Sequence, residues 1–128
     1  MPVRSLTSAV MKWPTREAAL EAARRWARSL AAEDPNLLAI ACVGSAGRGD
    51  WGVGSDLDLV VIVREAPDDP VERLRRYEPS SLPVPADVFI YTQAEWAKLL
   101  TDRPLLRRRW KAEWLTLAGE VPSPRPGS

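Results

Sequence analysis

The chain has 128 residues, 45% of them apolar and 27% charged, which is the composition of one globular domain that can bury a core. Its 18 basic and 17 acidic side chains give a formal charge of +1, so the overall charge favours neither nucleic acid nor an anionic membrane as a partner. The sequence has no histidine, which excludes histidine zinc sites, Ser-His-Asp triads and histidine general bases.

The sequence carries no signal for export or membrane insertion. The first residues contain no apolar core of a signal peptide, and no apolar run approaches the roughly 18 residues of a membrane span. The one cysteine, Cys42, cannot form an internal disulfide and lies in an apolar run, where a buried and unreactive thiol is expected. We therefore expect a cytoplasmic protein without a membrane partner.

Three segments are predicted along the chain: a lead-in over residues 1–14, a single domain over residues 15–120 and a disordered tail over residues 121–128. The tail contains three prolines and few apolar side chains. At the start of the domain, Thr15 is expected to cap an amphipathic helix of about 17 residues, because alanines and Leu30 recur at helical spacing. Pro35 ends this helix, since the residue before a proline is displaced from helical geometry.

Two strands are predicted next, joined by a glycine-rich connection. Residues 37–43 form a continuous apolar run, which is typical of a strand covered on both faces. Gly44-Ser45 breaks this run, and residues 46–50 are expected to form a short helical turn. Residues 57–63 form the second strand, in which both faces are apolar beyond the first residues. This strand is therefore central, and its acidic start lies at an edge or mouth of the sheet.

The second half of the chain alternates short helices and strands. A surface connection follows the second strand, with a short helix over residues 70–77. Residues 84–91 are predicted to form a third strand, after which Thr92 and Glu95 form a capping box for a helix. Another helix is expected over residues 104–111. Residues 114–118, before Gly119, are consistent with either a short strand or a helix end.

Three aspartates are candidates for a metal site. Asp56 and Asp58 are two residues apart on an extended chain, so they project the same way with their roots about 6.6 Å apart. Asp87 lies on another predicted strand, with apolar neighbours on both sides, and the three carboxylates converge if the two strands are neighbours. Two such charges about 5 Å apart repel by roughly 3 kcal/mol at an effective dielectric near 20. A hard cation such as Mg²⁺ or Mn²⁺ removes this repulsion.

The Gly-Ser turn, Gly44-Ser45, has the features of a phosphate site. Gly44 allows a sharp backbone turn, Ser45 offers a hydroxyl, and N–H groups at the start of the following helical turn point at anionic oxygens. Neither the turn nor the Asp-x-Asp pair is specific alone, since an isolated pair of this kind is more often a solvated strand end.

Together the two motifs resemble the signature of the DNA polymerase beta-like nucleotidyltransferase superfamily: Gly44-Ser45, ten intervening residues, then Asp56-Leu57-Asp58. The glycine-rich connection and the short chain are similar to its minimal nucleotidyltransferases. The resemblance covers residues 36–92. It implies an α/β (α+β) fold with a small, mixed and mostly antiparallel sheet flanked by helices.

The resemblance also implies an activity: transfer of a nucleoside monophosphate from ATP or another NTP to a hydroxyl, with two Mg²⁺ ions, or Mn²⁺, as cofactors. By this correspondence, Gly44 and Ser45 would hold the terminal phosphates, Asp56 and Asp58 would bridge both metals, and Asp87 would bind the metal that activates the acceptor. The Asp87 assignment depends on strand pairing. Its competitors Asp68 and Asp69 lie in a polar loop unsuited to a rigid ligand.

Two further residues are assigned to nucleotide binding with alternatives left open. Arg48 follows the turn and could touch the triphosphate, but a surface arginine or one paired with Asp50 is equally consistent. Ser55 could assist the nucleotide, although a structural role in the turn before the strand is favoured. The basic residues of the segment 107–111 are interpreted as a solvated face rather than a nucleic-acid site.

The resemblance leads to one leading hypothesis for the acceptor and two alternatives. Larger relatives carry additional helical domains that bind the acceptor, and this chain has no room for one. Minimal nucleotidyltransferases are often paired with a separate helical HEPN protein, so we expect AMP transfer to a hydroxyl of such a partner, as an antitoxin. The alternatives are a non-catalytic module that masks a partner, and a small-molecule nucleotidyltransferase. The acceptor, the nucleobase and the oligomeric state, including a homo-oligomer, are left open.

Overall fold

The protein, described by a computed structural model at residues 13–123 and 126, is built around one four-stranded sheet. The strands are β1 (Leu37–Val43), β2 (Leu57–Val63), β3 (Ala86–Thr92) and β4 (Leu115–Gly119). Their order across the sheet is β3-β2-β1-β4. β1 pairs antiparallel with β2 and β4, whereas β2 and β3 run parallel, so the predicted mixed and mostly antiparallel sheet is confirmed.

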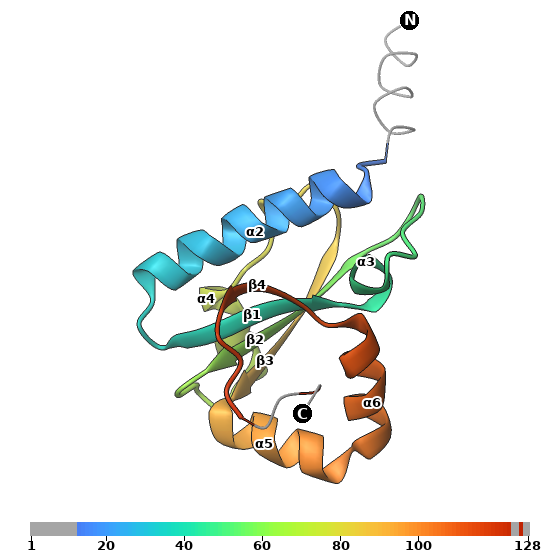
Figure 1. The fold of residues 1–128 in the computed structure, drawn as a ribbon. Helices are drawn as coiled ribbons and strands as arrows, with labels where there is room; N and C mark the ends of the chain where they lie inside the picture. The colour runs from blue at the N-terminus through green and yellow to red at the C-terminus, as the bar shows by residue number, and fades with distance from the viewer. Residues whose placement is uncertain (1–12, 124–125, 127–128) are drawn as a thin grey trace, which may run out of the picture.

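Helices cover both faces of the sheet (Figure 1). They are α2 (Arg16–Glu33), α3 (Gly44–Arg48), α4 (Pro70–Arg76), α5 (Gln93–Asp102) and α6 (Pro104–Glu113). The long helix α2 lies on one face, and α5 and α6 lie on the other. None of the helices in the described part of the chain combines the length and apolarity that crossing a bilayer requires.

The alternation of β2 divides the core between the two faces of the sheet. On the α2 side, three fully buried alanines at helical spacing allow α2 to pack closely on the sheet (Ala19, Ala23 and Ala27). On the other side, Trp96, Leu100 and Trp110 pack against Val60 and Ile62 of β2. Asp56 and Asp58 share the parity of Val60 and Ile62, so their side chains belong to the α5–α6 side of the sheet.

Most predicted boundaries agree with the structure within two residues, and the differences have physical reasons. Thr15 caps α2 and accepts a hydrogen bond from the Ala18 N–H, and Thr92 with Glu95 forms the predicted capping box of α5. β3 begins at Ala86 rather than at residue 84, because Pro85 lacks the N–H that a ladder needs. The segment before Gly119, left open between strand and helix, is the strand β4.

The two ends of the chain lie only partly within the described residues. The predicted lead-in falls outside them except for residues 13 and 14. The predicted disordered tail begins at residue 121, but Val121 is buried against the core on the α5–α6 side. Residues 124, 125, 127 and 128 lie outside the description, so the prediction for most of the tail stays a prediction.

Candidate active site

The Gly-Ser turn lies directly against the second aspartate of the Asp-x-Asp pair. Gly44 follows β1 with φ +75°, a conformation that favours glycine. A Cβ added at Gly44 would lie 2.4 Å from Oδ2 of Asp58, so a larger residue would collide with that carboxylate. The helix α3 starts at Gly44 itself, two residues earlier than the predicted helical turn. The structure therefore joins the two sequence motifs into one site at the end of the sheet.

The three candidate aspartates lie at the same end of two neighbouring strands. β2 and β3 are parallel, and their register pairs Asp58 directly with Asp87. Asp56 lies just before β2, two residues from Asp58. Burial is the main cause that raises the pKa of the Asp58 carboxyl, followed by repulsion from Asp87, Asp56 and Glu113. Arg109 partly opposes this shift. The strand pairing on which the Asp87 assignment depended is therefore present.

The three aspartates have the oxygen ligands that a hard divalent cation prefers, although their side chains are not arranged around one point. Within residues 13–123 and 126, no three Asp, Glu, Cys or His side chains are arranged as a group that could hold a metal ion. Asp56 and Asp87 are exposed, while Asp58 is half-buried, and its pKa is raised first by burial and then by repulsion from its acidic neighbours. Such a concentration of like charge is stabilised by a bound cation, and carboxylate oxygens are the ligands that Mg²⁺ prefers.

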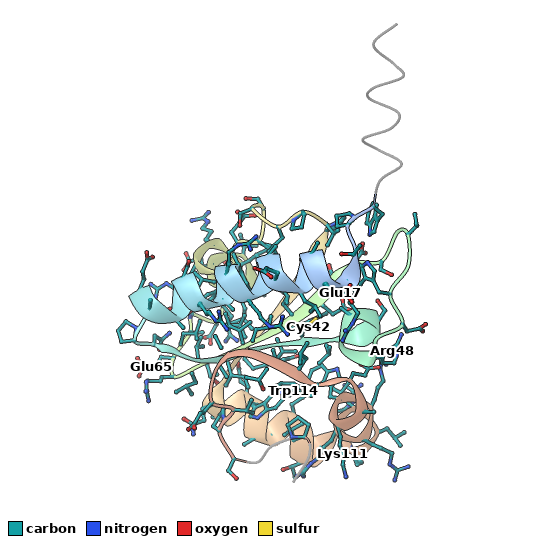
Figure 2. All side chains as sticks on the ribbon, turned by 45° about the horizontal axis from the view of Figure 1, so that its top comes forward. Glu17, Cys42, Arg48, Glu65, Lys111 and Trp114 are labelled. Atoms are coloured by element: carbon teal, nitrogen blue, oxygen red, sulfur yellow. The ribbon has the colours of Figure 1, made fainter. Side chains whose placement is uncertain are left out.

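Arg48 extends from the end of α3 (Figure 2). A carboxylate on α6 holds its guanidinium. Its Nη1 donates to Oε2 of Glu113 over 2.7 Å, and its Nη2 lies 3.7 Å from Oδ2 of the exposed Asp50. The hydrogen bond to Glu113 is the main cause that raises the pKa of Arg48. The ion pair with Asp50 that the sequence suggested is therefore present, but it is longer than the ion pair with Glu113.

The two serines differ in their surroundings. Within the described residues, the hydroxyl of Ser45 makes no hydrogen bond, and the side chain is only partly buried beside the turn. The hydroxyl of Ser55 accepts the N–H of Gly52 over 3.0 Å and closes the loop before β2. Ser45 can therefore take a ligand without losing a partner, whereas Ser55 has the structural contact that the sequence favoured.

Glu113 is a site residue that the sequence interpretation did not single out. Its Oε1 accepts the N–H of Gly44 over 3.1 Å, and its side chain is almost fully buried. A signal was present in the sequence: Glu113 lies at i+7 from Leu106 and i+3 from Trp110, on the apolar stripe of α6. An acidic residue at a core-facing position indicates a specific partner.

The competing aspartates of the loop have other contacts. Asp69 caps α4, and its side chain accepts the N–H of Val71 over 2.9 Å. Asp68 is exposed in the same loop. Neither lies at the end of the sheet where the Gly-Ser turn meets Asp58.

The sequence of residues 24–113 matches the family of nucleotidyltransferase domains, which covers most of the chain and the whole of the site. The chain belongs to this family. Its fold and its enzyme class are therefore those of a nucleotidyltransferase. No curated protein matches the sequence significantly.

Solved structures with the same fold include other nucleotidyltransferases. A candidate nucleotidyltransferase from Sulfolobus solfataricus is 17% identical over 83% of this chain and 89% of that chain, with a TM-score of 0.56. A toxin-antitoxin with AMP-PNP is 20% identical over 76% of this chain and 73% of that chain, with a TM-score of 0.54. A structure of a tri-AMPylated Shewanella oneidensis HEPN toxin in complex with an MNT antitoxin is 17% identical over 83% of this chain and 74% of that chain, with a TM-score of 0.50. At these identities the likeness shows the fold.

Proposed function

We propose that this nucleotidyltransferase is a minimal nucleotidyltransferase that transfers AMP from ATP to a hydroxyl of a separate helical partner protein of the HEPN type. The observation that carries the proposal is the register of Asp58 with Asp87, against the Gly-Ser turn at Gly44. The partner class is supported by the fold neighbours, which include a toxin-antitoxin with AMP-PNP and a tri-AMPylated HEPN toxin with its MNT antitoxin. Such a pair would work in the cytoplasm.

The residues of the site divide between two tasks in this proposal. Ser45, on the turn that Gly44 allows, binds the terminal phosphates together with Arg48, and Ser55 shapes the loop beside them. Asp56, Asp58 and Asp87 are the residues that would hold two Mg²⁺ ions, or Mn²⁺. Bound Mg²⁺ would supply charge stabilisation for the triphosphate and would lower the pKa of the acceptor hydroxyl.

The reaction follows as an in-line displacement at the α-phosphorus. The acceptor oxygen forms a bond to the α-phosphorus, the bond to the bridging oxygen breaks, and pyrophosphate leaves with that electron pair. The hydroxyl proton passes to a carboxylate, and Asp87 is assigned this role because it lies on the edge strand β3, where an acceptor can approach.

The test is transfer of label from ATP carrying radioactive α-phosphate to a purified helical protein of the HEPN type that co-purifies with this chain, in the presence of Mg²⁺. The partner should become labelled, Asp58→Asn should abolish labelling, and Asp68→Asn should leave it unchanged as the matched control. Undiminished labelling by Asp58→Asn would contradict the mechanism. A partner that co-purifies with the chain but is never labelled would instead indicate the non-catalytic masking module.

A further inference from the structure

Glu113 is the only charged side chain that is buried within the described residues, with 3% of its surface exposed. A buried carboxylate costs several kcal/mol unless hydrogen bonds and opposite charge compensate it. Here both oxygens have donors, since Oε1 accepts the Gly44 N–H and Oε2 accepts Nη1 of Arg48. Nε of Arg109, one turn earlier on α6, lies 3.7 Å from Oε2. Arg48 and Gly44 lie 65 and 69 residues before Glu113 in the sequence, so their contacts with it are tertiary contacts.

The backbone of Glu113 also lies against the Gly-Ser turn. A Cβ added at Gly47 would lie 1.8 Å from the carbonyl oxygen of Glu113, so α3 and the end of α6 are in direct backbone contact. From the opposite side, Nε of Arg16 donates to the carbonyl of Ala46 over 2.7 Å. A helix of five residues has no stability of its own. The position of α3 is therefore set by these contacts with α2 and α6.

The same contacts decide how Arg48 is presented. Arg48 lies three residues after Ser45, on the same side of α3. Its guanidinium is anchored at Nη1 by Glu113. Among the described residues, its other edge has only the 3.7 Å approach of an Asp50 side chain that is 80% exposed. A guanidinium held at one edge presents the other for bidentate contact with phosphate oxygens.

We propose that Glu113 is a positioning residue for the nucleotide site, which fixes the Gly-Ser turn and orients Arg48 towards the triphosphate of the NTP. This inference rests on the proposed nucleotidyltransferase function and deepens it. Because both carboxylate oxygens already accept hydrogen bonds, Glu113 is not counted among the metal ligands. A buried ion pair adds little net stability compared with apolar packing, so its effect lies in geometry.

The test is calorimetric binding of AMP-PNP with Mg²⁺ to the full chain and four variants. Glu113→Gln keeps an acceptor for the Gly44 N–H but removes the charge that holds Arg48, and we expect about tenfold weaker binding. Arg48→Ala should weaken binding at least as much. Arg48→Ala with Glu113→Gln should bind no more weakly than Arg48→Ala alone, because Glu113 acts through Arg48. The control variant, Glu72→Gln on α4, removes an exposed carboxylate and should bind as the parent chain does.

The possible results separate the inference from the proposed function. If the parent chain does not bind AMP-PNP, the proposed function fails and the inference fails with it. If the parent chain binds but Glu113→Gln binds equally well, only the inference is overturned. Additive losses in the double variant would assign Glu113 a merely structural role. If Glu113→Gln fails to fold, Arg48→Ala still tests the inference, because Arg48 is half-exposed and its loss should not prevent folding. Unchanged affinity of Arg48→Ala for AMP-PNP would contradict the proposed orientation of Arg48 towards the triphosphate.

Discussion

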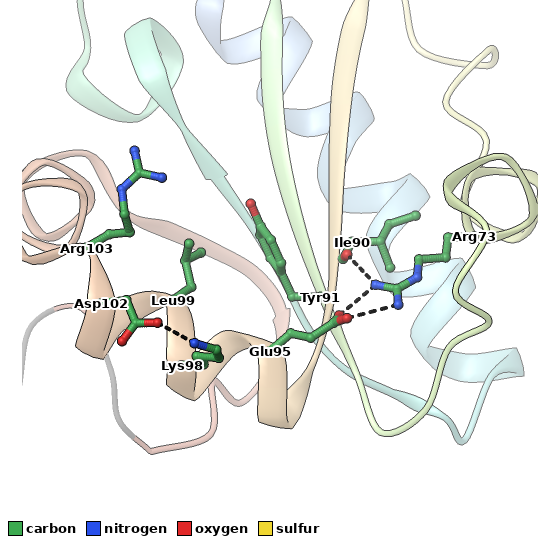
Figure 3. A pocket seen from close by; sticks show the side chains of 8 residues that line it. All are labelled: Arg73, Ile90, Tyr91, Glu95, Lys98, Leu99, Asp102 and Arg103. Atoms are coloured by element: carbon green, nitrogen blue, oxygen red, sulfur yellow. Dashed lines mark hydrogen bonds and ion pairs between the residues drawn. The ribbon is translucent and has the colours of Figure 1, made fainter.

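Glu95 makes two kinds of contact at the start of α5 (Figure 3). It completes the capping box with Thr92. Its two oxygens accept hydrogen bonds from Nη1 and Nη2 of Arg73, over 2.6 and 3.0 Å. Arg73 also donates to the carbonyl of Ile90 on β3. The hydrogen bonds from Arg73 are the main cause that lowers the pKa of Glu95 from 4.5 to about 2. This pair therefore ties α4 to β3 and α5.

The lowered pKa of Glu95 gives the free energy of unfolding a defined pH dependence. A carboxyl group with a lower pKa in the folded state adds stability that is fully present above its unfolded value and is lost as pH falls through its folded value. The contribution of Glu95 is therefore present above about 4.5 and is lost as the pH falls towards 2. Because the side chain is 46% exposed, solvent screening reduces the effect to about 1 kcal/mol.

We predict that Glu95→Gln lowers the free energy of unfolding by about 1 kcal/mol near neutral pH and by less as the pH approaches 2. Glutamine still completes a capping box, so the change removes mainly the charge that pairs with Arg73. Urea unfolding at a series of pH values measures this difference. Glu21→Gln, which removes an exposed i,i+4 pair with Arg25, is the control and should cost close to nothing. An equal cost for Glu95→Gln at all pH values would contradict the assignment.

Cys42 lies at the centre of the sheet, and its thiol should be unreactive in the folded protein. Burial is the main cause that raises its pKa to about 12. We predict that a thiol reagent near pH 8 labels the folded protein at least about 100-fold more slowly than the urea-unfolded protein, since only the thiolate reacts. Mass spectrometry over time measures both rates. Equal rates would mean that the strand β1 opens readily.

The site residues differ in how far the sequence could predict them. Local patterns predicted the strand β2 and the break at Gly44 separately, because both are short-range signals. That Asp58 and the Gly-Ser turn form one site was implied only by the family resemblance. The contact of Glu113 with Gly44 and Arg48 did not follow from local patterns, because it is set by how α6 returns to the end of β1. The apolar stripe of α6 lies in the core on the α5–α6 side of the sheet, and only the tertiary structure assigns its acidic member to the site.

At the scale of elements, the contact between α3 and α6 depends on the absence of a side chain at Gly47. We predict that Gly47→Ala destabilises the protein by about 2 to 4 kcal/mol, since the new Cβ would meet the carbonyl oxygen of Glu113 at 1.8 Å and force the backbones apart. Thermal unfolding followed by circular dichroism measures the loss.

Gly52 provides the matched control for this substitution. It lies in the same glycine-rich connection, its φ is not in the left-handed region, and a Cβ there would meet no atom of residues 13–123 within 4 Å. Gly52→Ala should therefore be neutral or stabilise by up to about 1 kcal/mol, through the lower entropy of the unfolded chain. If both substitutions had the same effect, close packing of α3 on α6 would not be its cause.

Elements were predicted from the sequence where the pattern was local and long enough. The helix α2 has helical periodicity, and the strands β1 and β2 are apolar runs with clear end signals, so their bounds agree with the prediction. The strand β4 could not be distinguished from a helix end, because five residues carry too little periodicity. Its state is decided by pairing with β1, which is a non-local contact.

At the scale of the whole molecule, two separate cores share the same central strands. Leu20 of α2 is buried in the core on one side of the sheet, and Leu100 of α5 is buried in the core on the other. β1 and β2 contribute alternate residues to both. Because each strand must be in place for either core to form, the two layers should unfold together.

We predict that Leu20→Ala and Leu100→Ala each lower the free energy of unfolding by about 2 to 5 kcal/mol and shift one common transition. Far-UV circular dichroism and tryptophan fluorescence should give the same midpoint for the parent chain and for both variants, as expected for a single cooperative domain. For a chain of this size, the midpoint should fall by about 3 to 5 °C for each kcal/mol. A variant in which the two signals separate, so that only one layer melts early, would show that the central strands do not couple the two cores.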